Sequence, residues 1–503
     1  MKASTPCCRG CDVLIRGATV IDGTGSARIR TDVRITDGRI AEIGQLSRDD
    51  HTIDADGLVL APGFIDCHTH DDEAVLADRT LACKTSQGVT TVVTGNCGIS
   101  LAPMRHCPEP APPPLDLFGG AGRYRFAQFR DYAAALAATP PAVHVAALVG
   151  HMTLRVEAMD RTDRPANERE IAHMAARLDA ALAEGALGLS TGLAYKPNQA
   201  APTAEVIALA QVVARYHGVY TTHMRDEGAA ILASIEETAE VGRAAGVAAI
   251  ISHHKLAGRP HFGGSTASLP LIEQLAARQP LGFDMYPYPA SSTVLEAHRV
   301  AMAERTIVTW SDPHPDCAGE DLAVIAARWG VTVEAAVTRL VPAGAIYFSM
   351  DEGDVRAILS HRLAMVGSDG LWMPTGRPHP RLWGTFPRVL GHYVRDVGLF
   401  DLETAVHRMT GLTAERFGLK DRGRIAVGAA ADLVLFDPTT IRDRATFDSP
   451  EEPAEGIHTV FVHGTPVWRD DRPTGATPGT LLDRRTQSRP MSTWRPQDHA
   501  PQF

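Results

Sequence analysis

The stretch Leu58-Val-Leu-Ala-Pro-Gly-Phe-Ile-Asp-Cys-His-Thr-His-Asp-Asp72 decides the fold of this chain. Its apolar run predicts a buried strand that is entered through Pro62 and Gly63 and ends at two histidines, His68 and His70. In an extended chain, residues i and i+2 point to the same side, so both imidazoles face one point with metal-ligand spacing. Taken alone, a His-x-His motif is about as often one core histidine beside one loop histidine as it is a pair of metal ligands. A pair where a buried strand ends, however, is where a (β/α)8 barrel carries its chemistry.

Length and composition are those of an ordinary globular protein, long enough for a full barrel and a second, smaller unit. The chain has 503 residues, of which 44% are hydrophobic and 21% charged, and its formal net charge is -10. That charge argues against nucleic acid as the main partner. No apolar run approaches membrane-spanning length, and the N-terminus lacks the apolar segment of a signal peptide. We therefore expect a cytoplasmic protein with no membrane partner.

The cysteines do not indicate a disulfide scaffold, because eight in a chain of this size are too few. Cys8 and Cys11 have the Cys-x-x-Cys spacing of metal and redox sites, but no second pair completes a four-ligand site. We interpret this pair as part of a frayed terminus.

Both ends of the chain consist of short β-segments separated by glycine turns. Neither end has enough strands to bury a sheet face alone, so the sequence predicts one small β-sandwich built from residues 1–62 and 419–482. Residues 483–503 are expected to be a tail, and the Pro, Arg, Thr and Gln content from Pro473 onward predicts extended or poorly ordered chain. The N-terminal β-segments are predicted at 13–15, 20–21, 33–35 and 40–43, with an Asp37-Gly38 hairpin turn between the last two.

Between these ends, over residues 63–418, strands alternate with helices. The clearest helix covers 167–185, with Asn167 as N-cap and Glu170 in the capping-box position; others cover 204–217 and 227–245. The gap between the last two strands is too long for one crossover, which predicts an inserted subdomain or lid around 291–362. The eight candidate strands are 64–67, 90–94, 143–148, 187–190, 219–222, 248–252, 281–285 and 364–367. This count predicts an α/β fold, a (β/α)8 (TIM) barrel inserted into the β-sandwich.

Metal-ligand residues stand at the ends of several predicted strands. Cys97 lies between glycines in the turn after the second strand, His223 ends the fifth, and His253 follows the sixth. The eighth strand ends in Gly-Ser-Asp-Gly and aims Asp369 at the same rim. One sulfur and two imidazoles with an open position form the ligand pattern of catalytic zinc.

With these motifs, the chain resembles the N-acyl-D-amino-acid deacylases (D-aminoacylases) of the amidohydrolase superfamily. The resemblance extends from the N-terminal strands to about Trp468. Many related hydrolases bridge two metals with a carboxylated lysine after the fourth strand, whereas Leu189-Ser190-Thr191 offers no lysine here. In the deacylases a cysteine in the position of Cys97 takes that part. The segments that carry the resemblance are Pro-Gly-Phe-Ile-Asp-x-His-x-His at 62–70, Lys-Thr-Ser-Gln-Gly-Val-Thr-Thr-Val-Val-Thr-Gly-Asn-Cys-Gly at 84–98, Ser-Thr-Gly-Leu-Ala-Tyr at 190–195, Ser-His-His-Lys at 252–255, Tyr-Pro-Tyr at 286–288, Gly-Ser-Asp-Gly at 367–370 and Arg-Pro-His-Pro-Arg-Leu-Trp-Gly at 377–384.

The resemblance implies a ligand set and a proton carrier. Cys97, His223 and His253 would hold a tight Zn2+, while His68, His70 and Asp369 would form a weaker second site. Asp369 would take a proton from the attacking water and hand it to the leaving amine. We expect His254 to point away from the metal, because neighbouring side chains on a strand face opposite sides. No nucleophilic serine is needed.

The resemblance also implies how a small-molecule N-acyl-D-amino acid would bind. Lys255, Tyr286, Ser292 and Arg381 are similar to the family's set for the substrate's α-carboxylate, and Arg381 could supply a bidentate fork. We expect Tyr288 to be a core residue. Arg299 stands where deacylases selective for D-glutamate carry an extra arginine, so our hypothesis for the substrate is N-acyl-D-glutamate.

Other functions remain open at this stage. The chain could be a broad N-acyl-D-amino-acid deacylase that prefers apolar D-residues, or a ring-opening cyclic amidase of the dihydropyrimidinase kind. The absence of a bridging lysine argues against the second. A metal-free scaffold without activity should have lost ligands, and this chain keeps all six candidates. The sequence leaves open whether the protein is a monomer or a small homo-oligomer, and whether the second metal site is filled.

Overall fold

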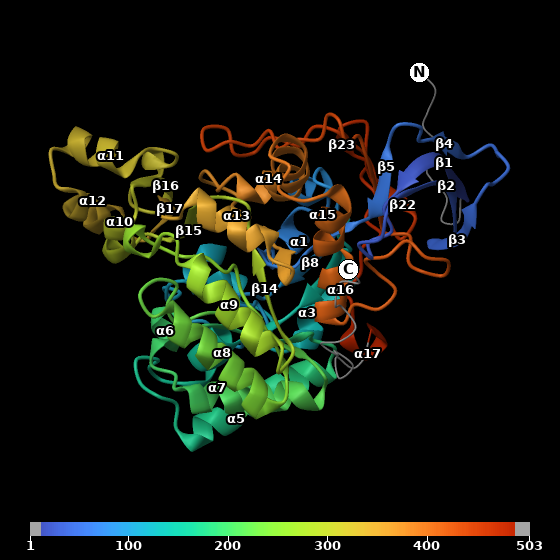
Figure 1. Cartoon of the computed structure of the whole chain (residues 1–503). Helices are drawn as coiled ribbons and strands as arrows, with labels where there is room; N and C mark the ends of the chain where they lie inside the picture. Colours follow the sequence, from blue (N-terminus) through green and yellow to red (C-terminus); the bar gives the residue numbers. More distant parts are fainter. Residues whose placement is uncertain (1–11, 488–503) are drawn as a thin grey trace.

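The computed structural model describes residues 12–487, and its centre is a barrel of parallel strands surrounded by helices (Figure 1). The strands follow one another in chain order, and each contains or overlaps one of the eight predicted segments. They are β6 (Phe64–Asp66), β8 (Val89–Thr94), β9 (His144–Ala147) with its continuation β10 (Val149–Gly150), β11 (Gly188–Gly192), β12 (Val219–His223), β13 (Ala248–Ile251), β14 (Leu281–Met285) and β18 (Ala364–Val366). The barrel closes where β7 (Thr69–His70) pairs in parallel with β19 (Gly370–Leu371). The prediction of a (β/α)8 barrel is confirmed.

One helix on the outside of the barrel begins with the capping box that the sequence predicts. In α5 (Glu168–Ala183), Asn167 Oδ1 accepts from Glu170 N at 3.0 Å, and Glu170 Oε2 accepts from Asn167 N at 2.8 Å, which is the predicted capping box. The helix predicted from residue 227 begins only at Ile231, because Asp226 accepts the backbone N–H groups of Gly228 and Ala230 and holds a turn there. The other crossover helices include α3 (Phe129–Ala138), α4 (His151–Ala158), α7 (Thr203–Arg215), α8 (Ile231–Ala245), α9 (Ser265–Ala276), α13 (Glu352–Ser360), α15 (Leu402–Met409) and α16 (Gly411–Phe417).

Strands from both chain ends form one sheet beside the barrel, at the right of Figure 1. The two ends meet where β5 (Val59–Pro62) pairs antiparallel with β20 (Leu433–Phe436). The sheet folds back on itself, because Ile40 N donates to the Ala429 carbonyl at 2.9 Å. The predicted segments 13–15 and 20–21 are one strand with a bulge rather than two. The remaining strands are β1 (Val13–Val20), β2 (Ile29–Thr36), β3 (Arg39–Gly44), β4 (Thr52–Asp54), β21 (Ile457–Val462), β22 (Thr465–Arg469) and β23 (Arg472–Pro473).

Strand β20 connects the sheet to the first barrel strand. Leu433 and Leu435 point into the core of the folded sheet, whereas Val434 and Phe436 belong to the core shared with the barrel. The Phe436 ring lies 6.4 Å from that of Phe64, the residue that opens β6. Alternate side chains of β20 therefore pack into both cores. One of them, Phe436, covers β6, the strand that leads to His68.

An inserted subdomain lies between β14 and α13 and extends to the side of the barrel opposite the sheet (Figure 1). It has its own apolar core, which includes Val308, Ile325 and Tyr347. Its elements are β15 (Ala290–Val294), α10 (Ala297–Met302), β16 (Arg305–Ser311), α11 (Leu322–Trp329), α12 (Val333–Leu340) and β17 (Ala343–Phe348). After β17 the chain returns to the barrel in α13. There the Asp354 carboxylate accepts hydrogen bonds from the backbone N–H of Gly263, just before α9, and from that of Ser265, the first residue of α9.

The segment after Pro473 differs from the expectation of extended or poorly ordered chain as far as residue 487. Leu482 N donates to the Val145 carbonyl at 2.7 Å, and Leu482 is buried in the core at the start of the barrel strands. Arg484 donates to the Tyr216 carbonyl at 2.5 Å and opens α17 (Arg484–Gln487). Composition does not show that Leu481 and Leu482 pack against the barrel, so it did not indicate that this largely irregular segment is held in place. Cys8, Cys11 and residues 488–503 lie outside the described part.

Among residues 12–487, no helix has both the length and the apolar character needed to cross a bilayer.

A buried ion pair links the helices α4 and α7. Arg155 and Glu205 contact each other with side chains that are 0% exposed, and His151 Nε2 lies 3.0 Å from the same carboxylate. Burial raises the pKa of Glu205, but the hydrogen bond from His151 and the charges of His151 and Arg155 lower it to about 2 from 4.5. The stabilisation is therefore complete above pH 4.5 and is lost as the pH falls toward 2.

We expect Glu205→Gln to lower the free energy of unfolding by about 3–5 kcal/mol at pH 7, because Arg155 would stay buried without a counter-charge. The difference from the unchanged protein should narrow below pH 4.5, where Glu205 of the unfolded chain takes up a proton. Urea unfolding at a series of pH values measures both effects. Asp163→Asn, which breaks an exposed ion pair with Arg161, is the control and should change stability little. A Glu205 variant as stable as this control would contradict the prediction.

Candidate metal centre

The residues predicted to bind metal all stand at the carboxyl ends of barrel strands. His68 and His70 follow β6, Cys97 follows β8, and His223 ends β12. His253 lies two residues after β13, and Asp369 lies three residues after β18. All six side chains are buried, with 0–7% of each residue exposed. Because parallel strands end on the same rim, residues scattered over 300 positions in the chain come together.

Four of these side chains converge on one point. Cys97 Sγ lies 3.3 Å from His68 Nε2 and 3.3 Å from His253 Nε2. Asp369 Oδ1 lies 3.6 Å from His68 Nε2, and all four ligand atoms lie within 4.8 Å of one another. The other two residues flank this group. The His223 ring is 4.5 Å from that of His253, and His70 Nε2 is 3.3 Å from Asp369 Oδ1.

Three of the converging residues have a left-handed backbone. The φ angle is +52° at Cys97, +37° at His253 and +48° at Asp369. Non-glycine residues adopt this region at a cost, and the cost is tolerated where the surroundings hold them in place. The turn at Cys97 is held by close contacts, since a Cβ at Gly192 would lie 2.2 Å from the Cys97 carbonyl oxygen. These turns direct the side chains inward, toward the barrel axis.

The charges in the centre favour a thiolate and a carboxylate. Burial raises the pKa of the Cys97 thiol, but the imidazoles of His68 and His253 lower it well below its usual value. Burial likewise raises the pKa of Asp369, and the Arg381 guanidinium outweighs it and lowers that pKa well below its ordinary value. Both groups are therefore anions that face several imidazoles.

The donor set fits a zinc-like cation. Neither ring nitrogen of His223 has a hydrogen-bond partner among residues 12–487, and the same holds for Nδ1 of His70. Buried imidazole nitrogens are rarely left unpaired, and a metal ligated by one would satisfy it. A thiolate with imidazoles is also the soft ligand set that zinc prefers. Strand β11 itself, Gly-Leu-Ser-Thr-Gly, contains no lysine, and Lys196, the first lysine after it, is exposed.

Two carboxylates behind the histidines were not found by sequence reasoning. Asp284 Oδ1 lies 3.2 Å from His68 Nδ1 and accepts from His253 N at 2.8 Å. Glu227 Oε1 lies 3.0 Å from His253 Nδ1. Metal-binding histidines commonly donate their second N–H to such groups, which fixes the ring and its tautomer. The signal available for Asp284 was an acidic residue inside an otherwise apolar strand; Glu227 lies in a turn and gave none.

A second group of possible ligands, made of His223, Glu227 and His253, already holds a cation of the protein itself. The Lys255 ammonium lies 2.5 Å from Glu227 Oε1 and 2.7 Å from His253 Nδ1. We therefore assign the metal to the Cys97 side of His253. His254 points away, as expected, and its Nε2 lies 3.0 Å from Ser268 Oγ.

Three of the predicted carboxylate-binding residues surround the side of the centre next to Asp369. Arg381 Nη2 lies 3.0 Å from Asp369 Oδ2, and the guanidinium stacks over the Tyr286 ring at 4.5 Å. Arg381 Nε and Nη1 and the Tyr286 hydroxyl have no hydrogen-bond partner within the described residues. Ser292 meets Arg381 through its backbone carbonyl, at 3.2 Å. The site thus contains buried donors with unused capacity.

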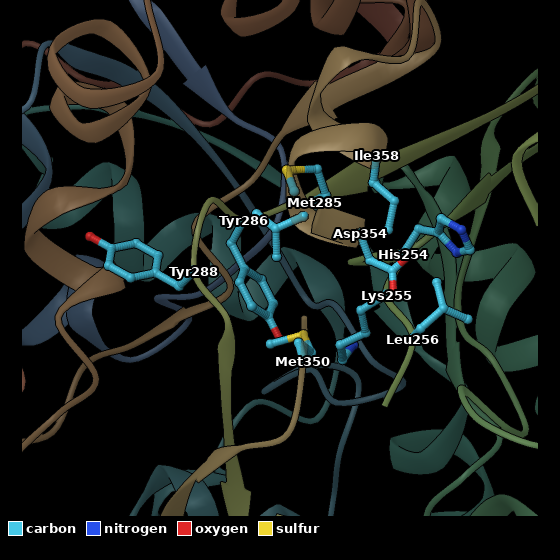
Figure 2. Close-up of a pocket in the computed structure, with 10 residues that line it drawn as sticks. His254, Lys255, Leu256, Met285, Tyr286, Tyr288, Met350, Asp354 and Ile358 are labelled. Atoms are coloured by element: carbon cyan, nitrogen blue, oxygen red, sulfur yellow. The ribbon is translucent and has the colours of Figure 1, made fainter. Parts of the chain in front are cut away.

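Lys255 lines a small cavity together with Tyr286 and Met350. Figure 2 shows the Tyr286 hydroxyl beside the Met350 sulfur and the Lys255 ammonium next to them, while His254 lies on the far side of Lys255. Tyr288 is buried in the same apolar cluster as Tyr286, which is the expected core placement. Asp354, Val355 and Ile358 of helix α13 also line the cavity.

Arg299 lies at the edge of the centre, on the inserted subdomain. Its Nε donates to Glu296 at 3.0 Å, and its guanidinium lies over the Tyr195 ring at 5.8 Å. The Tyr195 ring in turn is 4.8 Å from that of His223. One aromatic ring thus separates this arginine from a candidate ligand.

The sequence matches the amidohydrolase family over residues 51–268 and 319–468. The gap between the two matched parts covers β14 and the first part of the inserted subdomain, and the matched parts contain all six candidate metal ligands. The chain therefore belongs to the amidohydrolase family, and it is a metal-dependent amidohydrolase.

Within this family the chain belongs to the D-aminoacylases. It is 53% identical to D-aminoacylase from Alcaligenes xylosoxydans xylosoxydans over 475 residues, which are 94% of this chain and 98% of the relative. A D-aminoacylase structure that concerns a binuclear metal centre, with one-metal activation and second-metal attenuation, has a TM-score of 0.91 and 52% identity, and covers 94% of this chain and 99% of its own. N-acyl-D-glutamate deacylase from Bordetella bronchiseptica, complexed with zinc and a phosphonate inhibitor, has a TM-score of 0.90 and 46% identity over the same shares.

Proposed function

We propose that this enzyme hydrolyses the amide bond of N-acyl-D-amino acids to a carboxylate and a free D-amino acid. The observation that carries the proposal is the convergence of Cys97, His68, His253 and Asp369 within 4.8 Å, next to an arginine with unpaired donors. The high identity with deacylases over nearly the whole chain supports the substrate class. A cyclic amidase would need the same rim, so hydantoin hydrolysis is the assay that separates the two.

Zinc is the metal that this donor set suits, and the zinc complex of the glutamate deacylase supports that choice. Cys97, His223 and His253 would hold it tightly, with Glu227 behind His253. His68, His70 and Asp369 would form a weaker second site. Zinc, when bound, supplies a Lewis acid that polarises the amide carbonyl.

Asp369 is the proton carrier of the proposal. Its carboxylate is ionised, because Arg381 and the imidazoles outweigh the effect of burial on its pKa. It can accept a proton from the attacking water and deliver that proton to the amine nitrogen as the carbon–nitrogen bond breaks. The left-handed turn at Asp369 presents the carboxylate to both the imidazoles and Arg381.

The α-carboxylate of the substrate would meet Arg381, Tyr286 and Lys255. Arg381 Nε and Nη1 are unpaired donors on different edges of the guanidinium, so each can donate one charge-assisted hydrogen bond to a carboxylate oxygen. The unpaired Tyr286 hydroxyl adds a third donor, and the Lys255 ammonium, 5.7 Å from the Tyr286 ring centre, adds charge. The Ser292 carbonyl orients Arg381.

N-acyl-D-glutamate is our preferred substrate. Within the described residues, the hydrogen bond from Arg299 to Glu296 uses Nε, so the terminal nitrogens of Arg299 can serve a side-chain carboxylate of the substrate. The competing candidate is a broad deacylase that prefers apolar D-residues, and one observation favours it: identity is 52% with the D-aminoacylase structure and 46% with the D-glutamate deacylase structure. Kinetics with N-acetyl-D-glutamate, N-acetyl-D-leucine and N-acetyl-D-methionine, each beside its L form, decide between them.

We expect Arg299→Met to lower kcat/KM for N-acetyl-D-glutamate by about 10- to 100-fold, since it removes one charge-assisted contact. The value for N-acetyl-D-leucine should change by less than about threefold, because no charged side chain is lost from that complex. Arg305→Met is the matched control, as Arg305 lies on the same subdomain and pairs with Asp321 instead. An equal loss of kcat/KM on both substrates would refute D-glutamate selectivity, as would a preference of the unsubstituted enzyme for the apolar substrates. Neither result would contradict the deacylase activity itself.

A further inference from the structure

A lysine that takes no part in the mechanism above is completely buried beside the metal centre. Lys84 lies on the short helix α2 (Ala82–Thr85) and is 0% exposed. Its ammonium lies 2.9 Å from Asp66 Oδ2, 2.9 Å from Ser368 Oγ and 3.2 Å from Asp71 Oδ2. Removing an ammonium from water is costly unless it is fully paired, so this lysine has been placed with specific partners.

Each of its three partners is a near neighbour in sequence of a candidate ligand. Asp66 ends β6 two residues before His68, and Asp71 directly follows His70. Ser368 directly precedes Asp369. One ammonium therefore joins the two chain segments that carry the candidate second metal site.

Ser368 links the Lys84 ammonium to the turn that carries Asp369. Its hydroxyl oxygen accepts from Lys84 and from Gly370 N at 3.0 Å, and its backbone N donates to Asp66 Oδ1 at 2.8 Å. Asp369 N donates to the His68 carbonyl at 2.8 Å. The serine oxygen has two acceptor sites, and both are used to hold the left-handed turn.

The His253 side of the centre is supported by carboxylates other than those that pair with Lys84. His253 is held by Asp284, which also contacts His68, and by Glu227, and neither carboxylate contacts Lys84 among the interactions of residues 12–487. Although burial lowers the pKa of Lys84, the charges of Asp66 and Asp71 raise it above its ordinary value, so the group stays an ammonium.

We propose that Lys84 is a positioning residue for Asp369: through Ser368 it holds the catalytic carboxylate and the His68–His70 half of the centre in register, without touching substrate. The inference rests on the role of Asp369 in the proposed function. It assigns a task to the Lys-Thr-Ser-Gln-Gly segment at 84–88, for which the mechanism above has no use.

The test compares Lys84→Met, Ser368→Ala and the double variant. Lys84→Met should lower kcat on the best N-acetyl-D-amino acid by about 100-fold with KM within about threefold, because the carboxylate is displaced while the substrate sites remain. Ser368→Ala keeps the ion pairs of Lys84 with Asp66 and Asp71 and removes only the link to the turn, so its kcat should fall at least about tenfold. The double variant should be no slower than Lys84→Met, since both act on one chain of contacts.

Zinc titration of the metal-free protein supplies a readout apart from activity. Lys84→Met should keep one tightly bound zinc per chain and lose at least about tenfold in affinity for a second, as expected when a supporting group is removed. Lys420→Met, which changes an exposed lysine, is the control and should leave kcat and both affinities unchanged.

Three outcomes would overturn the inference: kcat of Lys84→Met within about threefold of the unchanged enzyme, loss of the tight zinc in step with turnover, or effects of the two single changes that multiply. If Lys84→Met does not fold, Ser368→Ala decides alone, and an unchanged kcat refutes the inference. If the enzyme without any substitution is inactive on every N-acyl-D-amino acid, the proposed function is refuted instead.

Discussion

Replacing Asp369 with asparagine should reduce kcat by about 10²–10⁴-fold, the range that general acid–base groups supply, while the tight zinc stays bound. Asparagine has nearly the same shape but cannot take a proton from water and return it to the amine. The tight ligands come from other strands, and within residues 12–487 the imidazoles that lie within 4 Å of the Asp369 carboxylate are those of His68 and His70. Turnover under saturating N-acetyl-D-amino acid and zinc content of the same sample measure the two effects.

The matched control for that change is Asp432→Asn. Asp432 is also buried and ion-paired, with His144 Nε2 at 3.3 Å and Arg422 Nε at 3.0 Å, but it contacts the first residue of β9, at the opposite end of the barrel strands. It should lower the melting temperature and leave kcat unchanged. An Asp369 variant that keeps kcat within tenfold, or that loses its tight zinc, would remove Asp369 from the proposed role.

The barrel could be predicted because its signals are local. The strands are short and buried on both faces, several of them are apolar runs such as Ala248–Ile251, and the capping box of Asn167 and Glu170 marks the start of a crossover helix. His68 and His70 are two residues apart in the chain, so strand geometry alone predicts that their side chains point to the same side. Cys97, His223, His253 and Asp369 needed one further step, namely that parallel strands end on one rim.

The remaining features depend on partners that are distant in sequence. Asp284 and Glu227 act through His68 and His253, and no spacing in the sequence connects them. Lys84 meets Ser368 across 284 residues. Leu482 reaches Val145 in the same way, so composition alone predicted a loose tail. Such contacts follow from the folded barrel and cannot be deduced before it.

Replacing Cys97 with alanine should remove both the tight zinc and turnover. Loss of a supporting group around a metal costs about 10- to 100-fold in affinity, so loss of the sulfur itself should cost more than about 100-fold. The imidazoles that lower the pKa of Cys97 would then face one another without the anion between them, which disfavours their closeness. Zinc content after dialysis and kcat with added zinc measure the outcome.

Cys107→Ala separates this effect from simple loss of a buried thiol. Cys107 is also buried, but burial and Glu109 raise its pKa to about 11, so it is a neutral thiol, and no imidazole of the described chain is among the groups that act on it. We expect this variant to keep zinc and kcat. The contrast isolates the cause: both thiols are out of water, and the histidines around Cys97 alone reverse the effect of burial on the thiol. If Cys97→Ala kept its zinc at full stoichiometry, the cation would belong to His68, His253 and Asp369 instead, and the assignment of a tight cysteine-ligated site would be wrong.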